Sequence, residues 1–207
     1  MFLATSNAGA APFPSVRNPS VPHRDEYDLL FSTCVVNPSR VADVDRLIER
    51  IKANRARYEQ VQTQTQVPWW FIAAVHSLEA DLNFRTHLHN GDPLSARTVH
   101  VPANRPVAGD PPFTWEESAL DALAYDHVSG WRDWTVGGAL YKLEGYNGFG
   151  YRRQGIHSPY LWSYSNHYTR GKYVSDGVWD PNAVSGQCGG GTLWRRMVNL
   201  GLIRIET

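Results

Sequence analysis

The feature that most restricts how this chain can fold is a nearly uninterrupted apolar stretch, WWFIAAVHSLEA, at residues 69–80. Pro68 precedes it, and proline suits the first turn of a helix, where its missing N–H needs no partner. A helix that is apolar on almost every side must be covered by other elements. The sequence therefore predicts a central, buried helix with the rest of the chain packed around it.

Apolar periodicity, capping residues and glycine stops predict further helices around this one. They cover residues 41–51, a segment that starts at Thr114 with Glu117 in its capping box, residues 135–143 with a stop at Gly145, and residues 192–200. Residues 189–191 are three glycines, but they lack the strand and the lysine of a phosphate-binding loop. Nucleotide binding is therefore not expected.

Residues 83–101 change character to short alternating segments around the turn signal Asn90-Gly91-Asp92-Pro93. This pattern predicts a small antiparallel β-hairpin. Residues 102–112 are expected to be a loop. Together with the helices, the hairpin predicts an α+β fold, in which a mainly helical body and a small hairpin lobe enclose a groove.

Residues 1–24 are rich in Pro, Ser, Ala and Asn without periodicity, which predicts a flexible N-terminal arm ahead of a single folded domain over residues 25–207. The N-terminus lacks the cationic start and apolar stretch of a secretory signal. No window is long and apolar enough to span a bilayer. We therefore expect a soluble, monomeric protein that has no membrane span and no recognisable export signal.

The composition narrows the range of partners. Twenty basic and 20 acidic residues balance, so nothing in the bulk charge attracts nucleic acid or an anionic membrane. Eight Trp and 10 Tyr exceed what core packing usually needs, and such rings cover the apolar faces of sugars, which indicates a carbohydrate groove. Cys34 and Cys188 lack a CxxC pattern, so they are two thiols or one long-range disulfide, and we favour thiols.

Glu79 lies near the end of the predicted buried helix. A carboxyl group in apolar surroundings has a raised pKa and can hold a proton for delivery to a leaving oxygen, as a glycosidase acid must. A structural role beside Arg85 is the alternative. Glycoside hydrolysis usually needs a second carboxylate, and Asp92 at the hairpin turn is the candidate, although an Asp there can simply serve the turn. Thr98, on the returning strand, could hold a water beside Asp92.

Glu79 at a helix end, Asp92 in a hairpin and Thr98 on the returning strand resemble the Glu, Asp and Thr of phage-type lysozymes. Five residues separate Asp92 from Thr98, as in that family, whereas the interval from Glu79 to Asp92 is longer here. Asp81 competes as the second carboxylate, but it would point away from Glu79 on the same helix. The resemblance implies a muramidase in which a water held opposite Glu79 attacks with inversion of the anomeric configuration.

A second resemblance lies in residues 143–151, LEGYNGFGY. It is similar to the Tyr-Asn-Gly or Tyr-Asn-Ala segment that follows a helix in goose-type lysozymes, lytic transglycosylases and related chitinases. The resemblance implies that Tyr146 and Asn147 contact an N-acetyl sugar, with Tyr151 and His76 as further substrate-binding candidates. Without Glu79 upstream, the segment fits a helix stop better.

The two motifs occur in the expected order over residues 67–151 and make the chain similar to bacterial and phage proteins of the lysozyme family. The implied activity is cleavage of the β-1,4 bond between N-acetylmuramic acid and N-acetylglucosamine in peptidoglycan, with chitin as a less favoured substrate. The resemblance implies a catalytic domain over residues 25–207 that needs no metal or organic cofactor. Such a protein would reach the bacterial cell wall during phage lysis or by injection.

A metallopeptidase that cuts peptidoglycan stem peptides is the main alternative enzyme. His76 and Glu79 have the His-x-x-Glu form of zinc carboxypeptidases, and His87, His89 and His100 could meet across a hairpin. A lytic transglycosylase is the nearest alternative, because it works with one Glu and no second carboxylate.

A non-catalytic glycan-binding module is the third alternative. It is supported by Trp131, Trp134, Trp162 and Trp179. Such a module leaves a carboxylate in a buried helix without explanation.

Overall fold

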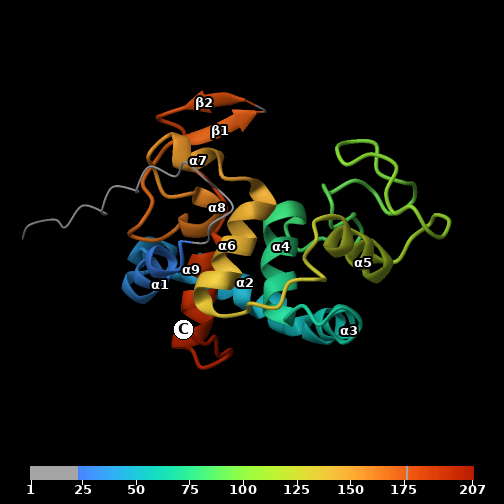
Figure 1. Ribbon diagram of the computed structural model, residues 1–207, viewed down its shortest axis with the longest axis horizontal. Helices are drawn as coiled ribbons and strands as arrows, with labels where there is room; N and C mark the ends of the chain where they lie inside the picture. Colours follow the sequence, from blue (N-terminus) through green and yellow to red (C-terminus); the bar gives the residue numbers. More distant parts are fainter. Residues whose placement is uncertain (1–22, 176) are drawn as a thin grey trace, which may run out of the picture.

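The computed structural model describes residues 23–175 and 177–207, and it has a mainly helical α+β fold with one small antiparallel sheet (Figure 1). The helices are α1 Arg24–Thr33, η1 Pro38–Arg40, α2 Val41–Ala53, α3 Arg55–Thr65, α4 Trp69–Ala80, α5 Trp115–Tyr125, α6 Val136–Asn147, α7 Gly150–Arg153, α8 Pro159–Trp162 and α9 Gly190–Asn199. The strands are β1 Lys172–Ser175 and β2 Val178–Asp180. The predicted α+β class is confirmed at this level.

The N-terminal arm predicted at residues 1–24 lies outside the described residues except for its last two. Helix α1 begins at Arg24, one residue before the predicted start of the folded domain. Within the part of the chain that the structure describes, no helix combines the length and the apolar composition that crossing a membrane requires.

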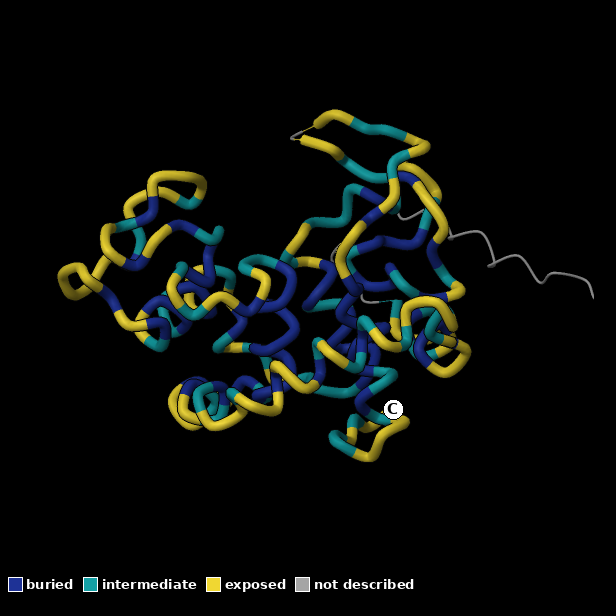
Figure 2. The backbone as a smooth tube through the Cα atoms, turned by 180° about the vertical axis from the view of Figure 1, so that it is seen from behind, coloured by how far each residue is buried: buried dark blue, intermediate teal, exposed yellow. Residues whose placement is uncertain are grey.

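The predicted buried helix is α4, with Pro68 at its N-cap and Ala80 as its last residue. Every residue from Trp69 to Leu78 is buried. Helix α4 packs against α3, α6 and α9, and Figure 2 shows the buried backbone concentrated in the middle of the molecule. The Trp194 indole N–H donates to the Trp70 carbonyl oxygen at 3.1 Å. The prediction of a central helix is confirmed.

The capping box predicted at the start of α5 is confirmed. The Thr114 hydroxyl accepts from the Glu117 N–H, and the Glu117 carboxylate accepts from the Thr114 N–H at 2.7 Å. Helix α6 begins after Thr135 as predicted but continues past Gly145. A glycine weakens a helix by about 1 kcal/mol without ending it. The residue that ends α6 is Gly148, which has the positive φ of 81°.

Helices α1 and α3 and the short helices η1, α7 and α8 were not predicted from the sequence. Helix α3 has the sequence RARYEQVQTQT, in which most residues are polar. Only a narrow stripe, Tyr58, Val61 and Thr65, is buried, so the apolar pattern is hard to detect in the sequence. This stripe faces α4 and α5. Such a helix is stabilised by its neighbours more than by its own periodicity, so the sequence pattern alone is weak.

The hairpin predicted at residues 83–101 is wrong in its location. The chain does reverse at Gly91, whose φ is 80°, but only an isolated bridge joins Thr86 to Pro93. Pro93, which lies within the predicted hairpin, has no backbone N–H to donate to a strand ladder. The antiparallel pair is instead β1 with β2, in the aromatic and glycine-rich stretch that follows α6.

Residues 83–113 form a lobe with α5, on the right of Figure 1. Side chains hold this lobe together. The Asp121 carboxylate on α5 binds the Arg105 guanidinium at 2.7 and 3.0 Å and the His89 ring at 2.8 Å. The Ser118 hydroxyl accepts from the Leu88 N–H at 3.1 Å. A polar network on α5 therefore replaces the sheet that the sequence predicted.

Candidate active site

The C-terminal end of α4 is abrupt, and this positions Glu79 in the last turn of the helix. Asp81 and Leu82 both have left-handed backbones, with φ of 45° and 54°. Their N–H groups both donate to the His76 carbonyl oxygen. Left-handed non-glycine residues cost about 1–2 kcal/mol each and tend to occur at functional sites. The Arg50 guanidinium donates to the Asp81 carbonyl oxygen at 2.6 Å and holds the turn.

Glu79 has the environment that a general acid needs. The Tyr160 hydroxyl donates to its Oε1 at 2.7 Å. The pKa of Glu79 is raised to about 7: burial raises it most, the Tyr160 hydrogen bond lowers it, and the negative charge of Asp126 raises it. Burial and the Glu79 charge raise the pKa of Tyr160 well above its ordinary value, so Tyr160 remains a neutral donor. Glu79 can therefore carry a proton near neutral pH.

Asp126, the residue after α5, is a second carboxylate at this site. Burial raises its pKa, while the Tyr146 hydroxyl and the Lys142 ammonium oppose that shift. Asp126, Lys142 and Tyr146 line a cavity of about 170 Å³ between the end of α5 and the C-terminal half of α6. The cavity thus lies between Asp126, which directly follows α5, and the helix that carries the Tyr-Asn-Gly segment.

Tyr146 interacts electrostatically with both carboxylates. Burial raises the pKa of Tyr146 well above its ordinary value, and the charges of Asp126 and Glu79 raise it further. Its hydroxyl oxygen is buried and makes no hydrogen bond of normal length and angle with any residue in the described ranges. This neutral hydroxyl is close enough to Asp126 to favour its ionised form. The structure therefore brings the predicted residues Glu79 and Tyr146 into one cluster.

Asp92, predicted as the second carboxylate, is bound within its own loop. Its Oδ2 accepts from the N–H groups of Val99 and His100 at 2.8 and 3.0 Å, and its Oδ1 lies 2.6 Å from the His100 ring. Burial alone would raise the pKa of Asp92, but these contacts lower it to about 2. The groups that set the Glu79 pKa are burial, Tyr160 and Asp126, and Asp92 is not among them. The role predicted for Asp92 is therefore not supported.

Thr98, predicted to hold a water beside Asp92, is buried and lies in a loop, with no returning strand around it. Its hydroxyl donates to the Pro102 carbonyl oxygen at 2.5 Å and accepts from the Arg105 N–H at 2.9 Å. The one proton of this hydroxyl is therefore already committed to the loop. Thr98 stabilises the loop of residues 98–105, and these contacts give no support to its predicted role of holding a water.

His76, predicted to bind substrate, has no exposed surface. Its ring packs against Trp115 and Phe84 with centroids 4.7 and 4.6 Å apart, and Nδ1 is 3.0 Å from the Tyr58 hydroxyl. Burial lowers the pKa of His76 to about 4, so the ring is neutral. A substrate cannot reach it, and this prediction is corrected.

Two of the histidines of the metallopeptidase hypothesis, His87 and His89, have ring centroids 5.8 Å apart and both lie beside the Ser118 hydroxyl. His87 bonds to Ser118 and the Ala96 carbonyl, His89 to Asp121, and His100 to Asp92. Among residues 23–175 and 177–207, no three His, Cys, Asp or Glu side chains lie together as a metal site would require. The geometry gives this alternative no support.

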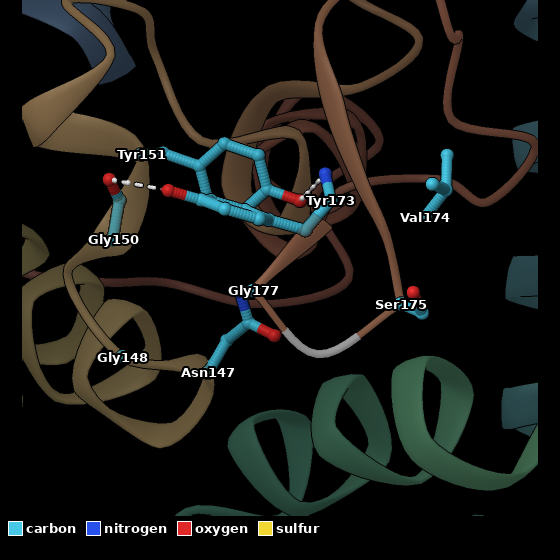
Figure 3. Close-up of a pocket in the computed structure, with 8 residues that line it drawn as sticks. All are labelled: Asn147, Gly148, Gly150, Tyr151, Tyr173, Val174, Ser175 and Gly177. Carbon is cyan, nitrogen blue, oxygen red and sulfur yellow. Dashed lines mark hydrogen bonds between the residues drawn. The ribbon is translucent and has the colours of Figure 1, made fainter. Parts of the chain in front are cut away.

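Asn147 and Tyr151, the remaining substrate-binding candidates, line a different pocket of about 410 Å³ together with Tyr173 of β1 (Figure 3). Asn147 is exposed and Tyr151 is largely buried at the pocket wall. Tyr146 faces the carboxylate cluster and Asn147 lies on the pocket wall, so the Tyr-Asn-Gly segment contributes to both.

Asp126 and Tyr160 were missed in the sequence analysis. Asp126 has a local context typical of any residue that follows a capped helix, and Tyr160 lies in the short helix α8 opened by Pro159. Neither local pattern indicates chemistry. Only the fold brings these residues together, because 33 residues lie between Asp126 and Tyr160 and 46 lie between Glu79 and Asp126.

A comparison of the chain with protein-family models, curated proteins and solved structures finds no match.

Proposed function

We propose that this protein cleaves the glycan strands of peptidoglycan as a muramidase, with Glu79 as the general acid. The observation that carries the proposal is the Glu79 carboxyl group, held by Tyr160 at a helix end and with a pKa of about 7. Cleavage of a glycosidic bond needs a proton for the leaving oxygen, and a carboxylic acid protonated near neutral pH supplies it.

The second carboxylate in this proposal is Asp126. Its charge acts on Glu79, whereas Asp92 is occupied by Val99 and His100. A carboxylate across the scissile bond either activates a water or stabilises the positive charge of the oxocarbenium-like transition state. The Tyr146 hydroxyl, which favours the ionised form of Asp126, supports either role.

The proposed arrangement is lysozyme-like. The glycan would lie across the C-terminal ends of α4 and α6, between the helical body and the lobe of residues 83–125. The small cavity beside Asp126 and Tyr146 supports this path, because it lies where lobe and body meet. The corresponding place of action is the bacterial cell wall, reached during phage lysis or by injection.

A lytic transglycosylase is the second candidate, and a specific observation favours it. The Asp92 and Thr98 side chains are engaged in their own loop, so the water-holding pair expected of an inverting hydrolase has no support. In that case Glu79 acts without an activated water, and an intramolecular hydroxyl of the sugar takes its place.

The test is digestion of purified, protein-free cell walls with the full chain, followed by mass spectrometry of the products. New reducing ends indicate a muramidase, and anhydro ends indicate a transglycosylase. Freed stem peptides would instead require a peptidase and overturn both proposals. The first-formed anomer, followed by NMR, then separates inversion from retention.

We predict that Glu79→Gln lowers the rate of wall digestion by about 10²-fold or more, because an amide cannot donate the required proton. The matched control is Glu59→Gln, which makes the same chemical change at a half-exposed position on α3. This control should keep the wild-type rate. If Glu79→Gln is folded and retains more than about a tenth of the rate, Glu79 is not the acid.

A further inference from the structure

A further cavity, of about 460 Å³, lies beside α2. Its described lining comes from α2 and the residue before it, from the end of α4, and from the loops at residue 164 and residues 186–188. The volume is within the range of small-molecule sites. The cavity is therefore large enough for an organic ligand as well as for a single ion.

This cavity lies on the side of α4 opposite to Glu79. Ser77 and Asp81 both line it, as residues four apart along a helix share one face. Glu79 lies between them in the sequence and is rotated by about 200° around the helix axis from Ser77. Its partner Tyr160 is on that other side. A ligand in this cavity would therefore lie outside the site of the proposed chemistry.

Three arginines give the cavity its chemical character: Arg40, Arg46 and Arg50. Arg40 and Arg46 each donate one N–H to the carboxylate of Asp43. Arg50 donates to Asp81, at 3.3 Å to its carboxylate and at 2.6 Å to its carbonyl oxygen. A guanidinium group has five N–H donors. Each arginine therefore keeps donors, its Nε–H among them, that no described residue accepts.

The two aspartates position these arginines without blocking them. Asp43 accepts from Arg40 through Oδ2 and from Arg46 through Oδ1, so one carboxylate holds two guanidinium groups. The Arg40 guanidinium also lies over the Tyr164 ring, 4.6 Å from its centroid. The three arginine side chains are between 45% and 71% exposed, and exposed ion pairs are weak. An incoming anion can therefore share these donors at little cost.

The Ser77 hydroxyl is an independent sign of a ligand. Ser77 is only 8% exposed and lines the cavity from α4. Its hydroxyl forms no hydrogen bond with any residue that the structure describes. A buried hydroxyl group normally has a partner, because removing it from water without one is costly. A ligand with acceptor oxygens would supply that partner.

We propose that this cavity binds a small anion that carries a phosphoryl group. A phosphoryl group has three terminal oxygens and a charge near −2, and it accepts hydrogen bonds from several directions. Guanidinium groups bind such oxygens through two parallel N–H donors. Here the donors come from Arg46 and Arg50 on α2, from Arg40 just before it and from Ser77 on α4. A carboxylate, with two oxygens in one plane, would leave more of these donors unused. This inference goes beyond the proposed function and does not depend on it.

The binding test is calorimetric titration of the full chain with inorganic pyrophosphate at low ionic strength. We expect one site per chain and an affinity that falls as salt is added, because the arginines are partly exposed. Citrate is the parallel probe, since it carries its negative charges on carboxylates alone. Citrate should bind several-fold more weakly than pyrophosphate. If citrate binds as tightly, the assignment to a phosphoryl group is wrong.

Arg46→Gln should weaken pyrophosphate binding about tenfold, the scale of one lost hydrogen bond to a charged group. Arg46 is 71% exposed and its ion pair with Asp43 is a surface pair, so the variant should stay folded. The matched control is Arg55→Gln, which removes an exposed and paired arginine from α3, outside the cavity. Arg55→Gln should bind pyrophosphate like the wild-type chain.

Ser77→Ala removes only the unpartnered hydroxyl and should weaken binding several-fold. Thermal unfolding with and without pyrophosphate checks each variant, because a ligand of the native state raises its unfolding midpoint. This rise should be present in the Arg55→Gln control and smaller in Arg46→Gln. If pyrophosphate does not bind, or if Arg46→Gln and Ser77→Ala bind it like the control, the cavity is not an anion site. An equal loss of affinity in Arg46→Gln and Arg55→Gln would mean that pyrophosphate is attracted by general surface charge, and would also overturn the proposal.

Discussion

Two carboxylates near the end of α4, Glu79 and Asp81, have very different surroundings although only one residue lies between them. Asp81 has a side chain that is 83% exposed and pairs with Arg50 across solvent. Glu79, two residues earlier, points to the other side of the helix, where Tyr160 and Asp126 surround it. The same functional group is therefore an exposed partner of an arginine at position 81 and a buried carboxyl group with a raised pKa at position 79.

We predict that Asp126→Asn moves the alkaline limb of the pH–activity profile to lower pH and lowers the maximal rate by about 10²-fold. In the proposed mechanism Glu79 acts in its protonated form, so activity should be present below its pKa of about 7 and be lost as pH rises through that value. The Asp126 charge raises this pKa, and removing the charge should lower it. The measurement is kcat/KM between about pH 4 and 9 on solubilised glycan strands.

Asp92→Asn is the matched control for that experiment. Its hydrogen bonds to residues 99 and 100 make it a structural residue, so its loss should cost about 1–3 kcal/mol of stability without moving the limb. The pKa of Asp92 is lowered to about 2, so its contribution to stability is present above about pH 4 and is lost as pH falls toward 2. If Asp92→Asn shifts the alkaline limb of the pH–activity profile and Asp126→Asn does not, Asp92 would again be the candidate for the second carboxylate.

At the scale of elements, the sequence predicts those features whose causes are local. The apolar run of α4 and the capping box of α5 depend on neighbours within one or two turns, so their residues specify them directly. Glu79 could be identified because it lies in such a run. The strands β1 and β2 have three or four residues each, and their pairing depends on aromatic packing with Tyr151. No local pattern contains that information, and the same is true of the pairing of Glu79 with Asp126.

The glycines before α9 are an element whose role only the packing reveals. A Cβ at Gly189 would lie 2.4 Å from the backbone of Leu161, and one at Gly190 would lie 2.4 Å from the Leu143 side chain. Helix α9 therefore approaches α8 and α6 closely because it starts with glycine. The sequence gives a phosphate loop little support here, and the structure gives a packing reason for these glycines.

We predict that Gly189→Ala lowers the free energy of unfolding by about 1–3 kcal/mol, because the added methyl group meets backbone atoms that cannot move aside. The control is Gly186→Ala, at a position where an added Cβ meets nothing within 4 Å. Urea unfolding followed by circular dichroism measures both. Equal midpoints for the two variants would mean that α9 can shift away from α8 at little cost.

At the scale of the whole molecule, the first described helix, α1, packs against helices from the C-terminal half of the chain. Helix α1 packs on α6 and α9. The Arg152 guanidinium on α7 bonds to Glu26 of α1 at 3.1 Å and to Glu144 of α6 at 2.8 Å, and this network is largely buried. Removing one member of a buried ion pair typically costs about 3–5 kcal/mol. Helix α1 is therefore part of the core. Detaching α1 from α6 and α9 would break this packing and the buried ion pairs.

The reactivity of the two cysteines can show whether α1 and α9 stay packed in the core. Cys34 follows α1 and Cys188 precedes α9, and both are buried free thiols. Burial raises the pKa of Cys34 to about 11 and that of Cys188 still further. A thiol that is both neutral and inaccessible does not attack a disulfide reagent, so reaction requires opening of the fold.

We predict that neither thiol of the native protein reacts promptly with an aromatic disulfide reagent at pH 8, and that both react once urea unfolds the chain. Because α1 and α9 pack in one core, the two thiols should become reactive at the same urea concentration, and Cys34→Ser and Cys188→Ser assign each signal. A thiol that reacts at once in native buffer would mean that the α1 end or the start of α9 opens independently. Unfolded, unreduced protein without free thiols would mean that the two cysteines form a disulfide and that their assignment as thiols is wrong.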